Sequence, residues 1–221
     1  ADCGIDRPDL RFGLNLKDMS DIAQGSTFKG FTSTIENGGV VKGLCAPAGD
    51  TYSRADIEKT LTNLVMDFGA KGLSWSKIKM EGSTPTFIGG GIGKFFSPEQ
   101  QRQLIERFGA KDGDLILLVA DKEATANKAL APLRCRVGRD LKLYDPGVFE
   151  FVWVVDFPLF EWNADEKRYD SVHHPFTAPV PEDLPKLETD PMHIRSQAYD
   201  IVLNGNEIGV QVSLKQKDDA R

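Results

Sequence analysis

Residues 53–69 place apolar side chains at helical spacing between clear helix-end signals. Ser53 and Asp56 form an acidic capping box, and Gly69 follows the last apolar position. The apolar positions that recur every three or four residues are Ile57, Leu61, Leu64, Val65 and Phe68. This pattern predicts an amphipathic helix whose apolar face packs on a core.

Two further stretches predict helices. In residues 97–109, Ser97 is the expected N-cap, Gln100 completes a capping box, and a glycine ends the run. Residues 123–138 also have a helical pattern, but Pro132 is expected to kink or break that helix.

Strand patterns separate these helices. Residues 28–35 (FKGFTSTI) and 39–47 (GVVKGLCAP) flank the sequence ENGG, so we expect them to form a β-hairpin. Residues 73–80 alternate between apolar and polar side chains, and residues 114–121 (DLILLVAD) form a continuous apolar run typical of a central strand. The order β-β-α-β-α-β-α predicts a two-layer α+β domain, with an antiparallel or mixed sheet that carries helices on one face.

The predicted core of this region joins the apolar faces of two helices to the apolar strand. Its expected members are Ile57, Leu61, Leu64, Phe68, Leu104, Ile105, Leu115, Leu117 and Val119. The glycine-rich stretch 87–94 (FIGGGIGK) does not have the spacing of a phosphate-binding P-loop, and no helix starts directly after it. We interpret it as a loop in which glycine supplies backbone angles that other residues avoid.

The pattern changes in the last third of the chain. Residues 148–162 (VFEFVWVVDFPLFEW) are apolar, aromatic and β-branched, which predicts a long strand in a well-covered sheet. Residues 173–191 are rich in proline and have no helical period. The stretch of residues 196–209 is expected to contain a short apolar helix, which stops at Asn204 and Gly205. These features predict a second structural unit.

Composition narrows the class of protein. The chain has 221 residues, of which 40% are hydrophobic and 27% charged, and no apolar run is long enough to span a membrane. The three cysteines lack metal-ligand spacing and the N-terminus lacks the pattern of a secretory signal, so we expect a cytoplasmic protein. The first residue is Ala1, without an initiator Met, which we interpret as the sign of a fragment or a trimmed product.

The formal net charge of −6 is unevenly distributed. Residues 20–148 carry 17 Lys and Arg against 15 Asp and Glu, whereas residues 149–221 carry 7 against 14. The acidic last third therefore does not resemble a nucleic-acid surface, which needs Lys and Arg for phosphate contacts. Carboxylates suit metal ligation, although a solvated face is the more common explanation of such an excess.

Two of the three histidines are adjacent, in the sequence HHPFTAP of residues 173–179. An imidazole is a good donor to a carboxylate, so the pair is a candidate binding site. Without further support, a histidine pair before a proline is more often simply part of a loop.

Four motifs resemble those of bacterial-type aspartyl-tRNA synthetases, a class II family. In that family's order and at about its spacing, they are DRPDLRF (6–12), FVWVVDFPLFEW (151–162), HHPFTAP (173–179) and AYDIVLNGNEIG (198–209). The resemblance implies that residues 20–148 are a GAD domain inserted into a catalytic domain. Residues 1–19 and 149–221 are then segments of that catalytic domain, with the resemblance fading after about residue 209.

The reaction implied by this resemblance is the activation of L-aspartate with ATP, followed by transfer of the aspartyl group to tRNA. It depends on positioning and on Mg²⁺ that neutralises phosphate oxygens. By resemblance, Glu207 contacts ATP directly and through Mg²⁺, and Asp200 supports the metal; Mg²⁺ prefers such hard oxygen ligands. Without the flanking motif, Asp200 would be interpreted as part of a salt bridge and Glu207 as a surface residue.

By the same resemblance, His173 contacts the substrate L-aspartate. His174 and Gly209 are expected to support this pocket, His174 by shaping the loop or by orienting its neighbour.

The chain also departs from the family. The family continues after Glu207 with further glycines and an arginine that binds the substrate carboxylate, but Val210 and Gln211 replace glycines here and Leu214 stands at the arginine position. Leucine cannot replace a guanidinium in carboxylate recognition. The motif-2 loop with the arginine that holds the α-phosphate has no counterpart in the printed sequence either. Because electrostatic stabilisation is usually the largest catalytic term, we expect this chain alone to be inactive.

Two functions remain open at this point. The first is part of an aspartate–tRNA ligase, whose parent enzyme binds tRNA, L-aspartate and ATP and is expected to be a homodimer. The second is a non-catalytic GAD module that binds tRNA or protein, as in a subunit of a tRNA-dependent amidotransferase. The motifs HHPFTAP and AYDIVLNGNEIG favour the first, because a free-standing module does not need them. The altered tail after Gly209 keeps the second open.

Overall fold

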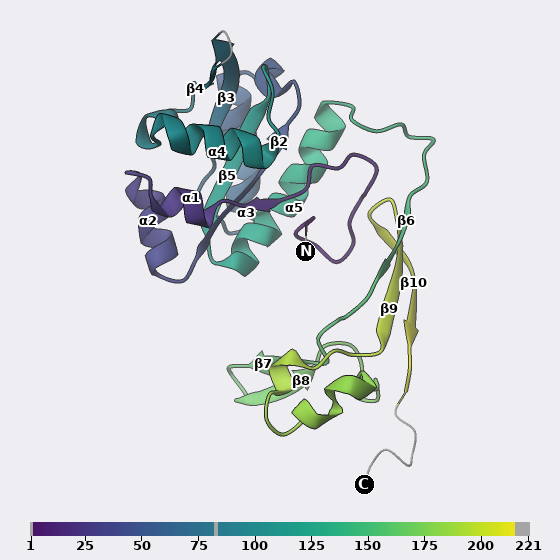
Figure 1. Ribbon diagram of the computed structural model, residues 1–221. Helices are drawn as coiled ribbons and strands as arrows, with labels where there is room; N and C mark the ends of the chain where they lie inside the picture. The colour runs from purple at the N-terminus through teal and green to yellow at the C-terminus, as the bar shows by residue number, and fades with distance from the viewer. Residues whose placement is uncertain (1, 82–83, 215–221) are drawn as a thin grey trace. The chain divides into compact units, whose positions relative to one another are not determined.

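A computed structural model describes residues 2–81 and 84–214 of the chain (Figure 1). The chain divides into two compact units. Unit 1 comprises the described residues up to Asp6 and those of Arg11–Val148. Unit 2 comprises Arg7–Leu10 and the described residues from Phe149 onward.

Unit 1 is built on a five-stranded antiparallel sheet with the strand order β1-β2-β5-β3-β4. The strands are β1 (Lys17–Asp18), β2 (Val40–Ala46), β3 (Ser74–Glu81), β4 (Thr84–Ile88) and β5 (Leu115–Asp121). The continuous apolar run lies on β5 in the middle of the sheet, as predicted. The predicted α+β class and the antiparallel pairing are confirmed.

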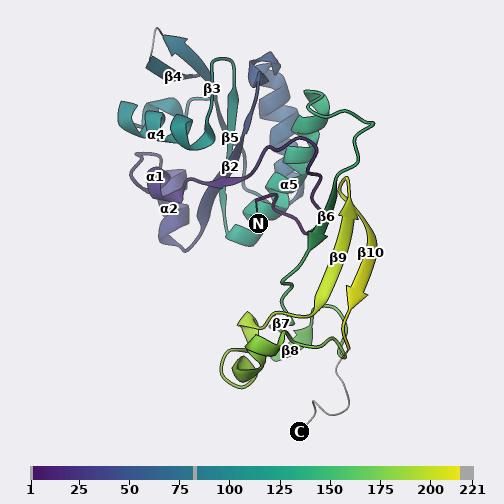
Figure 2. The same ribbon diagram turned by 45° about the vertical axis from the view of Figure 1, so that its right-hand side comes forward.

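Helices pack on both faces of this sheet, whereas the sequence analysis placed them on one face. The helices are α1 (Ser20–Gln24), α2 (Lys29–Glu36), α3 (Thr62–Asp67), α4 (Pro98–Phe108) and α5 (Glu123–Asp140), and Figure 2 shows them on either side of the strands. Leu115, Leu117 and Val119 pack with α3 and α5, whereas Ile116 and Leu118 pack with α1, α2 and α4. A strand that is apolar at every position is buried on both faces, so the run on β5 requires a layer of helices on each side.

Residues 28–35, which were predicted as one strand of a hairpin, instead enter helix α2. Phe31 is buried, and its ring centroid lies 4.8 Å from that of Phe28 and 6.0 Å from that of Phe96. This aromatic packing outweighs the strand preference of Phe and Thr, which depends strongly on context.

The predicted helix caps are confirmed. The amide of Ser53 donates to the Asp56 carboxylate at 3.0 Å, and the amide of Asp56 donates to the Ser53 hydroxyl at 3.1 Å. The backbone then forms a π-helix over Asp56–Leu61, which continues as α3. At α4, Ser97 and Gln100 make the two reciprocal bonds of a capping box.

The predicted core residues are buried except at Phe68 and Leu64, but they do not form one core: Leu104 and Ile105 pack on the opposite face of the sheet from the others. The side chain of Phe68 is 38% exposed, because α3 ends at Asp67 and Phe68 lies beyond the apolar face of the helix. Leu64 is partly buried against the core, and the other predicted members are buried.

Replacing the cap of α4 gives a first test of these elements. Ser97→Ala removes the hydroxyl that accepts from the Gln100 amide, and we expect it to lower the free energy of unfolding of unit 1 by about 1 kcal/mol. Ser33→Ala, at an exposed position inside α2, is the matched control and should change it by less than about 0.5 kcal/mol. Urea unfolding followed by circular dichroism measures both, and equal effects would show that the cap does not contribute.

Helix α5 passes through Pro132 without a break, one of the two effects that the sequence predicted. The residues around the proline that are buried against the core are Ala129, Leu130, Ala131 and Leu133. Tertiary packing of this face keeps the helix continuous, although Pro132 has no amide to donate.

Residues 11–18 belong to unit 1. The buried guanidinium of Arg134 donates through Nε to the Gly13 carbonyl at 3.0 Å and lies 4.5 Å from the centroid of the Phe12 ring. The compact unit is therefore larger than the expected segment 20–148. The assignment of residues 1–19 and 149–221 to a catalytic domain stays a prediction.

The glycine-rich loop after β4 has the backbone that only glycine adopts easily. Gly89, Gly90 and Gly91 have φ values of 68°, 62° and 74°. A side chain at Gly90 would overlap the carbonyl of Trp75. Backbone geometry therefore explains these glycines, as the sequence analysis proposed.

Unit 2 contains a three-stranded antiparallel sheet, β10-β9-β6, and the separate pair β7-β8. The strands are β6 (Phe151–Val154), β7 (Phe160–Asn163), β8 (Arg168–Ser171), β9 (Ala198–Leu203) and β10 (Asn206–Val212). Among the described residues, no helix is both long and apolar enough to cross a membrane.

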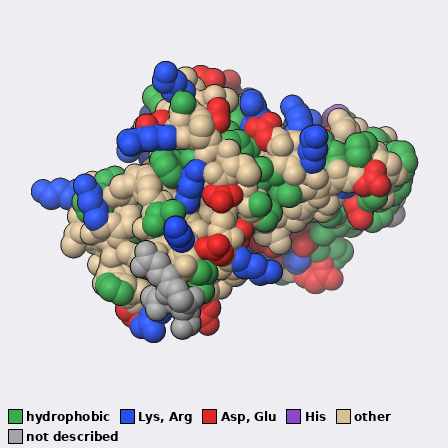
Figure 3. Space-filling model, turned by 90° about the horizontal axis from the view of Figure 1, so that it is seen from above, with side chains coloured by type: hydrophobic (Ala, Val, Ile, Leu, Met, Phe, Trp, Pro, Cys, Tyr) green, Lys and Arg blue, Asp and Glu red, His purple; other side chains and the backbone are tan. Residues whose placement is uncertain are grey.

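The predicted long strand over residues 148–162 is wrong in two respects. It is divided into β6 and β7, and Asp156 between them has a φ of 59°, which no extended strand contains. Phe151 and Trp153 are 58% and 56% exposed, so this sheet is not well covered. Hydrophobic side chains gather at the right-hand side of Figure 3, the side on which Figure 1 draws β6, β9 and β10.

Candidate functional site

The hairpin of β9 and β10 carries both acidic residues of the predicted site. The sequence pattern predicted a short helix here, but Ala198–Leu203 is a strand and the chain turns at Asn204 and Gly205. Their φ values of 49° and 83° fit a type I′ turn, for which Asn-Gly is a favoured sequence. The Asn-Gly pair is therefore a hairpin signal and not a helix stop.

The strand register places Asp200 and Glu207 on one face of the sheet. Glu207 is opposite Val202, which lies two residues after Asp200 on β9. Residues directly opposite each other, and residues two apart on one strand, share a face. The side chain of Asp200 is buried, with 4% exposed, whereas Glu207 is exposed. The exposed carboxylate of Glu207 thus lies on the same face of the sheet as the buried carboxylate of Asp200. We call this face the acidic face.

Gly209 belongs to the opposite face of the sheet. It is opposite Ile201, and a side chain built on it would contact Ile201 at 3.2 Å. Ile201 lies between Asp200 and Val202 along β9, so its side chain points to the opposite face. The structure therefore places Gly209 behind the acidic face.

The two carboxylates, Asp200 and Glu207, are the metal ligands that the family resemblance implies. No group of three or more His, Cys, Asp or Glu side chains that could hold a metal ion occurs in the part of the chain that the structure describes. Mg²⁺ is usually bound by one or two carboxylates together with water and substrate phosphates. Asp200 and Glu207 fit that pattern.

The histidine pair lies in an exposed turn after β8. The ring of His173 packs edge-on against Phe157, with 4.7 Å between ring centroids. His174 accepts from the Phe176 amide through Nδ1 at 3.2 Å, and its carbonyl accepts from the Thr177 amide at 2.9 Å. His174 therefore stabilises the turn, while the exposed ring of His173 is oriented by Phe157.

The turn of residues 173–177, which we call the histidine turn, is held by hydrogen bonds beyond the end of β10, away from Glu207. The Ala178 amide donates to the Ser213 carbonyl at 2.8 Å, and Thr177 forms a bridge with Leu214. Glu207 is opposite Val202 and the Ser213 amide donates to the Gln197 carbonyl, so Glu207 and Ser213 lie about 17 Å apart along the sheet. Asp200 is opposite Val210, between the two. The structure thus groups Asp200 with Glu207 and attaches the histidine turn at the other end of their hairpin.

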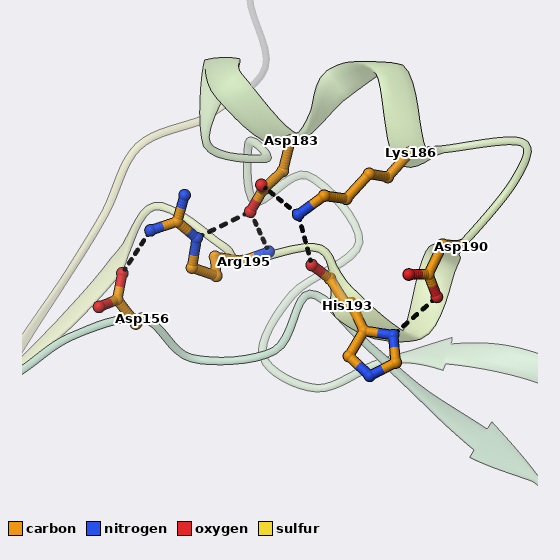
Figure 4. Close-up of polar contacts among 6 residues, drawn as sticks. All are labelled: Asp156, Asp183, Lys186, Asp190, His193 and Arg195. Carbon is orange, nitrogen blue, oxygen red and sulfur yellow. Dashed lines mark hydrogen bonds and ion pairs between the residues drawn. The ribbon is translucent and has the colours of Figure 1, made fainter.

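A second charged cluster, which the sequence analysis did not single out, lies between β8 and β9 (Figure 4). Its centre is Asp183, whose side chain is 4% exposed and accepts hydrogen bonds from Arg195 and Lys186. Hydrogen bonds from Arg195, and then from Lys186, hold the pKa of Asp183 well below its usual range. No local motif marks this carboxylate, because its main partner is 12 residues away in the sequence.

Comparison with known proteins defines the class of unit 1 first. The family model described as GAD domain matches residues 31–130, which lie inside unit 1. This part of the chain is therefore similar to GAD domains.

Particular relatives then extend the relationship to both units. The chain is 48% identical over 207 residues to an aspartate–tRNA(Asp/Asn) ligase of Anoxybacillus flavithermus and 49% identical over 206 residues to one of Moorella thermoacetica. It is 48% identical over 207 residues to an aspartate–tRNA ligase of Bacillus licheniformis. Each similarity covers 93% of this chain, which spans about a third of the length of these relatives. The aligned stretch is about twice as long as the GAD match, so residues outside the GAD domain are related to the ligases as well.

Proposed function

We propose that this chain is part of an aspartate–tRNA ligase and supplies its GAD domain together with strands of its catalytic domain. The parent enzyme activates L-aspartate with ATP and transfers the aspartyl group to tRNA. The observation that carries the proposal is the identity of 48–49% to ligases over 93% of the chain, which includes residues of both units. A free-standing GAD module would not account for similarity outside residues 31–130.

The acidic face of the hairpin is the proposed ATP end of the site. Glu207 is exposed, and it would contact ATP and help to hold Mg²⁺. Asp200 is buried on the same face and would be the second carboxylate that supports the metal. When bound, Mg²⁺ would neutralise charge on the phosphate oxygens. The residues of this chain thus hold the nucleotide, and the developing charge is stabilised electrostatically.

The histidine turn is the proposed L-aspartate end of the site. The ring of His173 donates to a substrate carboxylate, and its edge-on contact with Phe157 limits the directions in which it can point. His174 supports the pocket by holding the turn. Gly209 is the other supporting residue that we propose: it lies behind the face that carries Glu207 and Asp200, where a side chain would press on Ile201.

The remaining properties of the parent follow from this proposal. Its partners are tRNA, L-aspartate, ATP and a second copy of the enzyme, and its place of action is the cytoplasm. These are proposals for the whole enzyme, of which the chain spans about a third.

The chain alone is expected to be inactive. Its sequence has Leu214 where the family binds the substrate carboxylate with an arginine, so the positive charge that the reaction needs is missing there. Aspartate-dependent exchange of pyrophosphate into ATP measures the first step, and we expect none above background. Turnover at about a thousandth of a normal ligase rate, with contamination excluded, would contradict this expectation.

A chimera tests the proposed function itself. Residues 2–209 replace the aligned stretch of the Bacillus licheniformis ligase, whose own sequence follows from that point on. We expect aspartate-dependent exchange within about tenfold of the unaltered ligase. A second chimera that exchanges only residues 31–130 is the matched control. Activity in the second but not in a folded first chimera would limit this chain to a GAD module and overturn the proposal.

A further inference from the structure

The carboxylate of Asp183 is saturated with donors in a nearly solvent-free position. Asp183 lies in the short 3₁₀ segment Pro181–Lys186, and its side chain is 4% exposed. Oδ2 accepts from the backbone amide of Arg195 at 3.0 Å and from its Nε at 2.8 Å, while Oδ1 accepts from the Lys186 ammonium at 2.8 Å (Figure 4). Hydrogen bonds between charged groups are short, strong and directional, so they fix the place of Arg195.

Arg195 is the point at which three segments of unit 2 meet. Its backbone carbonyl accepts from the Val180 amide at 2.9 Å, which ties it to the end of the histidine segment. Its Nη1 contacts the Asp156 carboxylate at 3.4 Å, and its backbone forms a bridge with Pro158, both in the connection between β6 and β7. One side chain and its own backbone thus join segments that are far apart in the sequence.

The contacts continue from Arg195 into both ends of the proposed site. Two residues on, the Gln197 amide donates to the Ala178 carbonyl at 2.8 Å, and Gln197 Nε2 donates to the Pro179 carbonyl at 2.8 Å. Strand β9 then begins, and it carries Asp200. On the other side, Ala178 lies directly after the turn that His173 and His174 form. The clamp, by which we mean Asp183 and Arg195, therefore lies where the histidine turn meets β9.

Only the carboxylate of this ion pair is buried. The side chain of Asp183 is 4% exposed, whereas those of Arg195 and Lys186 are 44% and 43% exposed. Solvent screens the charges of half-exposed partners, so such pairs contribute little to stability. What the clamp supplies is a fixed geometry between the segments that it joins, and we therefore interpret it as a device for positioning.

We propose that Asp183 is a positioning residue for the L-aspartate end of the site: by clamping Arg195, it holds the histidine turn at a fixed place relative to β9 and Asp200. This inference rests on the proposed function. Asp183 does not touch substrate, and it acts through Arg195 and the backbone of residues 178–180.

The first test uses the 221-residue chain itself and needs no activity. Asp183→Asn keeps the shape of the side chain but removes its charge, and we expect amide hydrogen exchange at Val180 and Gln197 to speed up about tenfold or more. Asp190→Asn is the matched control, because Asp190 is an exposed carboxylate of the same loop that pairs with His193 at 2.7 Å and not with Arg195. Unchanged exchange in Asp183→Asn would overturn the clamp.

The pH dependence of the same exchange has a definite sign. The pKa of Asp183 is lowered in the folded chain, so its contribution to stability is fully present above the pKa of an unfolded Asp, about 4, and is lost as the pH falls through the lower folded value. Protection of Val180 and Gln197 should therefore persist at pH 4. Its loss at pH 5 would contradict the clamp.

The second test separates positioning from general damage, in the active chimera. Asp183→Asn should raise KM for L-aspartate about tenfold and leave KM for ATP within about twofold, because a displaced binding group costs affinity at its own end of the site. Arg195→Lys keeps the charge without the planar donor pair and should give a smaller rise, about threefold. Asp190→Asn should stay within about twofold for both substrates.

The outcomes distinguish the two proposals. An unsubstituted chimera that folds but has no activity overturns the proposed function, and this inference with it. An active chimera in which Asp183→Asn raises both KM values equally, or neither, overturns the inference alone. If Asp183→Asn does not fold, KM for L-aspartate is measured in Arg195→Lys instead. An unaltered value in that variant overturns the inference.

Discussion

Glu207→Gln, introduced into the active chimera, is expected to raise KM for ATP and the Mg²⁺ concentration needed for half-maximal rate about 100-fold or more. The substitution removes one negative charge at constant shape from an exposed position on the acidic face. Mg²⁺ binds poorly to a neutral amide oxygen, and Asp200 would be the remaining carboxylate of the proposed pair. KM for L-aspartate should change by less than about threefold, because the histidine turn is anchored about 17 Å along the sheet from Glu207.

His173→Ala should show the reverse selectivity, with KM for L-aspartate raised and the Mg²⁺ requirement unaltered. The matched control for Glu207→Gln is Glu161→Gln, which makes the same change at an exposed position on β7. Initial rates of pyrophosphate exchange over a grid of ATP, Mg²⁺ and L-aspartate concentrations separate the three variants. Equal losses for both substrates in Glu207→Gln would show that Glu207 does not act at the ATP end.

Elements whose ends are specified by local chemistry could be predicted from the sequence. Ser97 and Gln100 satisfy each other's neighbouring amides within one turn, so the start of α4 needs no knowledge of the rest of the fold. The run on β5 could also be placed, because a strand that is apolar on both faces belongs in the middle of a covered sheet. The number of helix layers follows from the same run, although the sequence analysis did not draw that conclusion.

Elements that depend on distant partners could not be predicted in this way. Residues 28–35 have strand-like composition, and they form a helix because Phe31 packs on Phe96, which is far away in the sequence. The stretch 198–203 was assigned to a helix because short apolar runs do not distinguish the two periods. Its alternating burial, with Ala198, Asp200 and Val202 inside, is visible only once β6 and β10 pair with it.

The residues of the candidate site also differ in whether the sequence alone could reveal them. Asp200, Glu207 and His173 were found through the family's motifs, and composition alone would have left them as a salt bridge, a surface residue and a loop. The hairpin register then shows which of them share a face. Asp183 could not be found from the sequence, because nothing near it in the chain distinguishes a buried carboxylate from the solvated ones around it.

Leu117→Ala is expected to lower the free energy of unfolding of unit 1 by about 3 kcal/mol. Leu117 lies on β5, fully buried, between Leu44 of β2 and Trp75 of β3. Truncation removes its methyl groups from the core between the sheet and helices α3 and α5, and a closely packed layer held on both sides by rigid elements relaxes little around the cavity. The cost should therefore include the cavity as well as the lost transfer free energy.

Urea unfolding followed by circular dichroism at the helical band measures this loss specifically in unit 1, because the α-helices in the described parts of the chain all belong to that unit. Met66→Ala is the matched control: its side chain is 50% exposed on α3, so its truncation should change the free energy of unfolding by less than about 0.5 kcal/mol. The midpoint should fall in Leu117→Ala without a change in the slope of the transition, since the surface exposed on unfolding is almost the same. A loss below about 1 kcal/mol would mean that Leu117 is not closely packed between the sheet and helices α3 and α5.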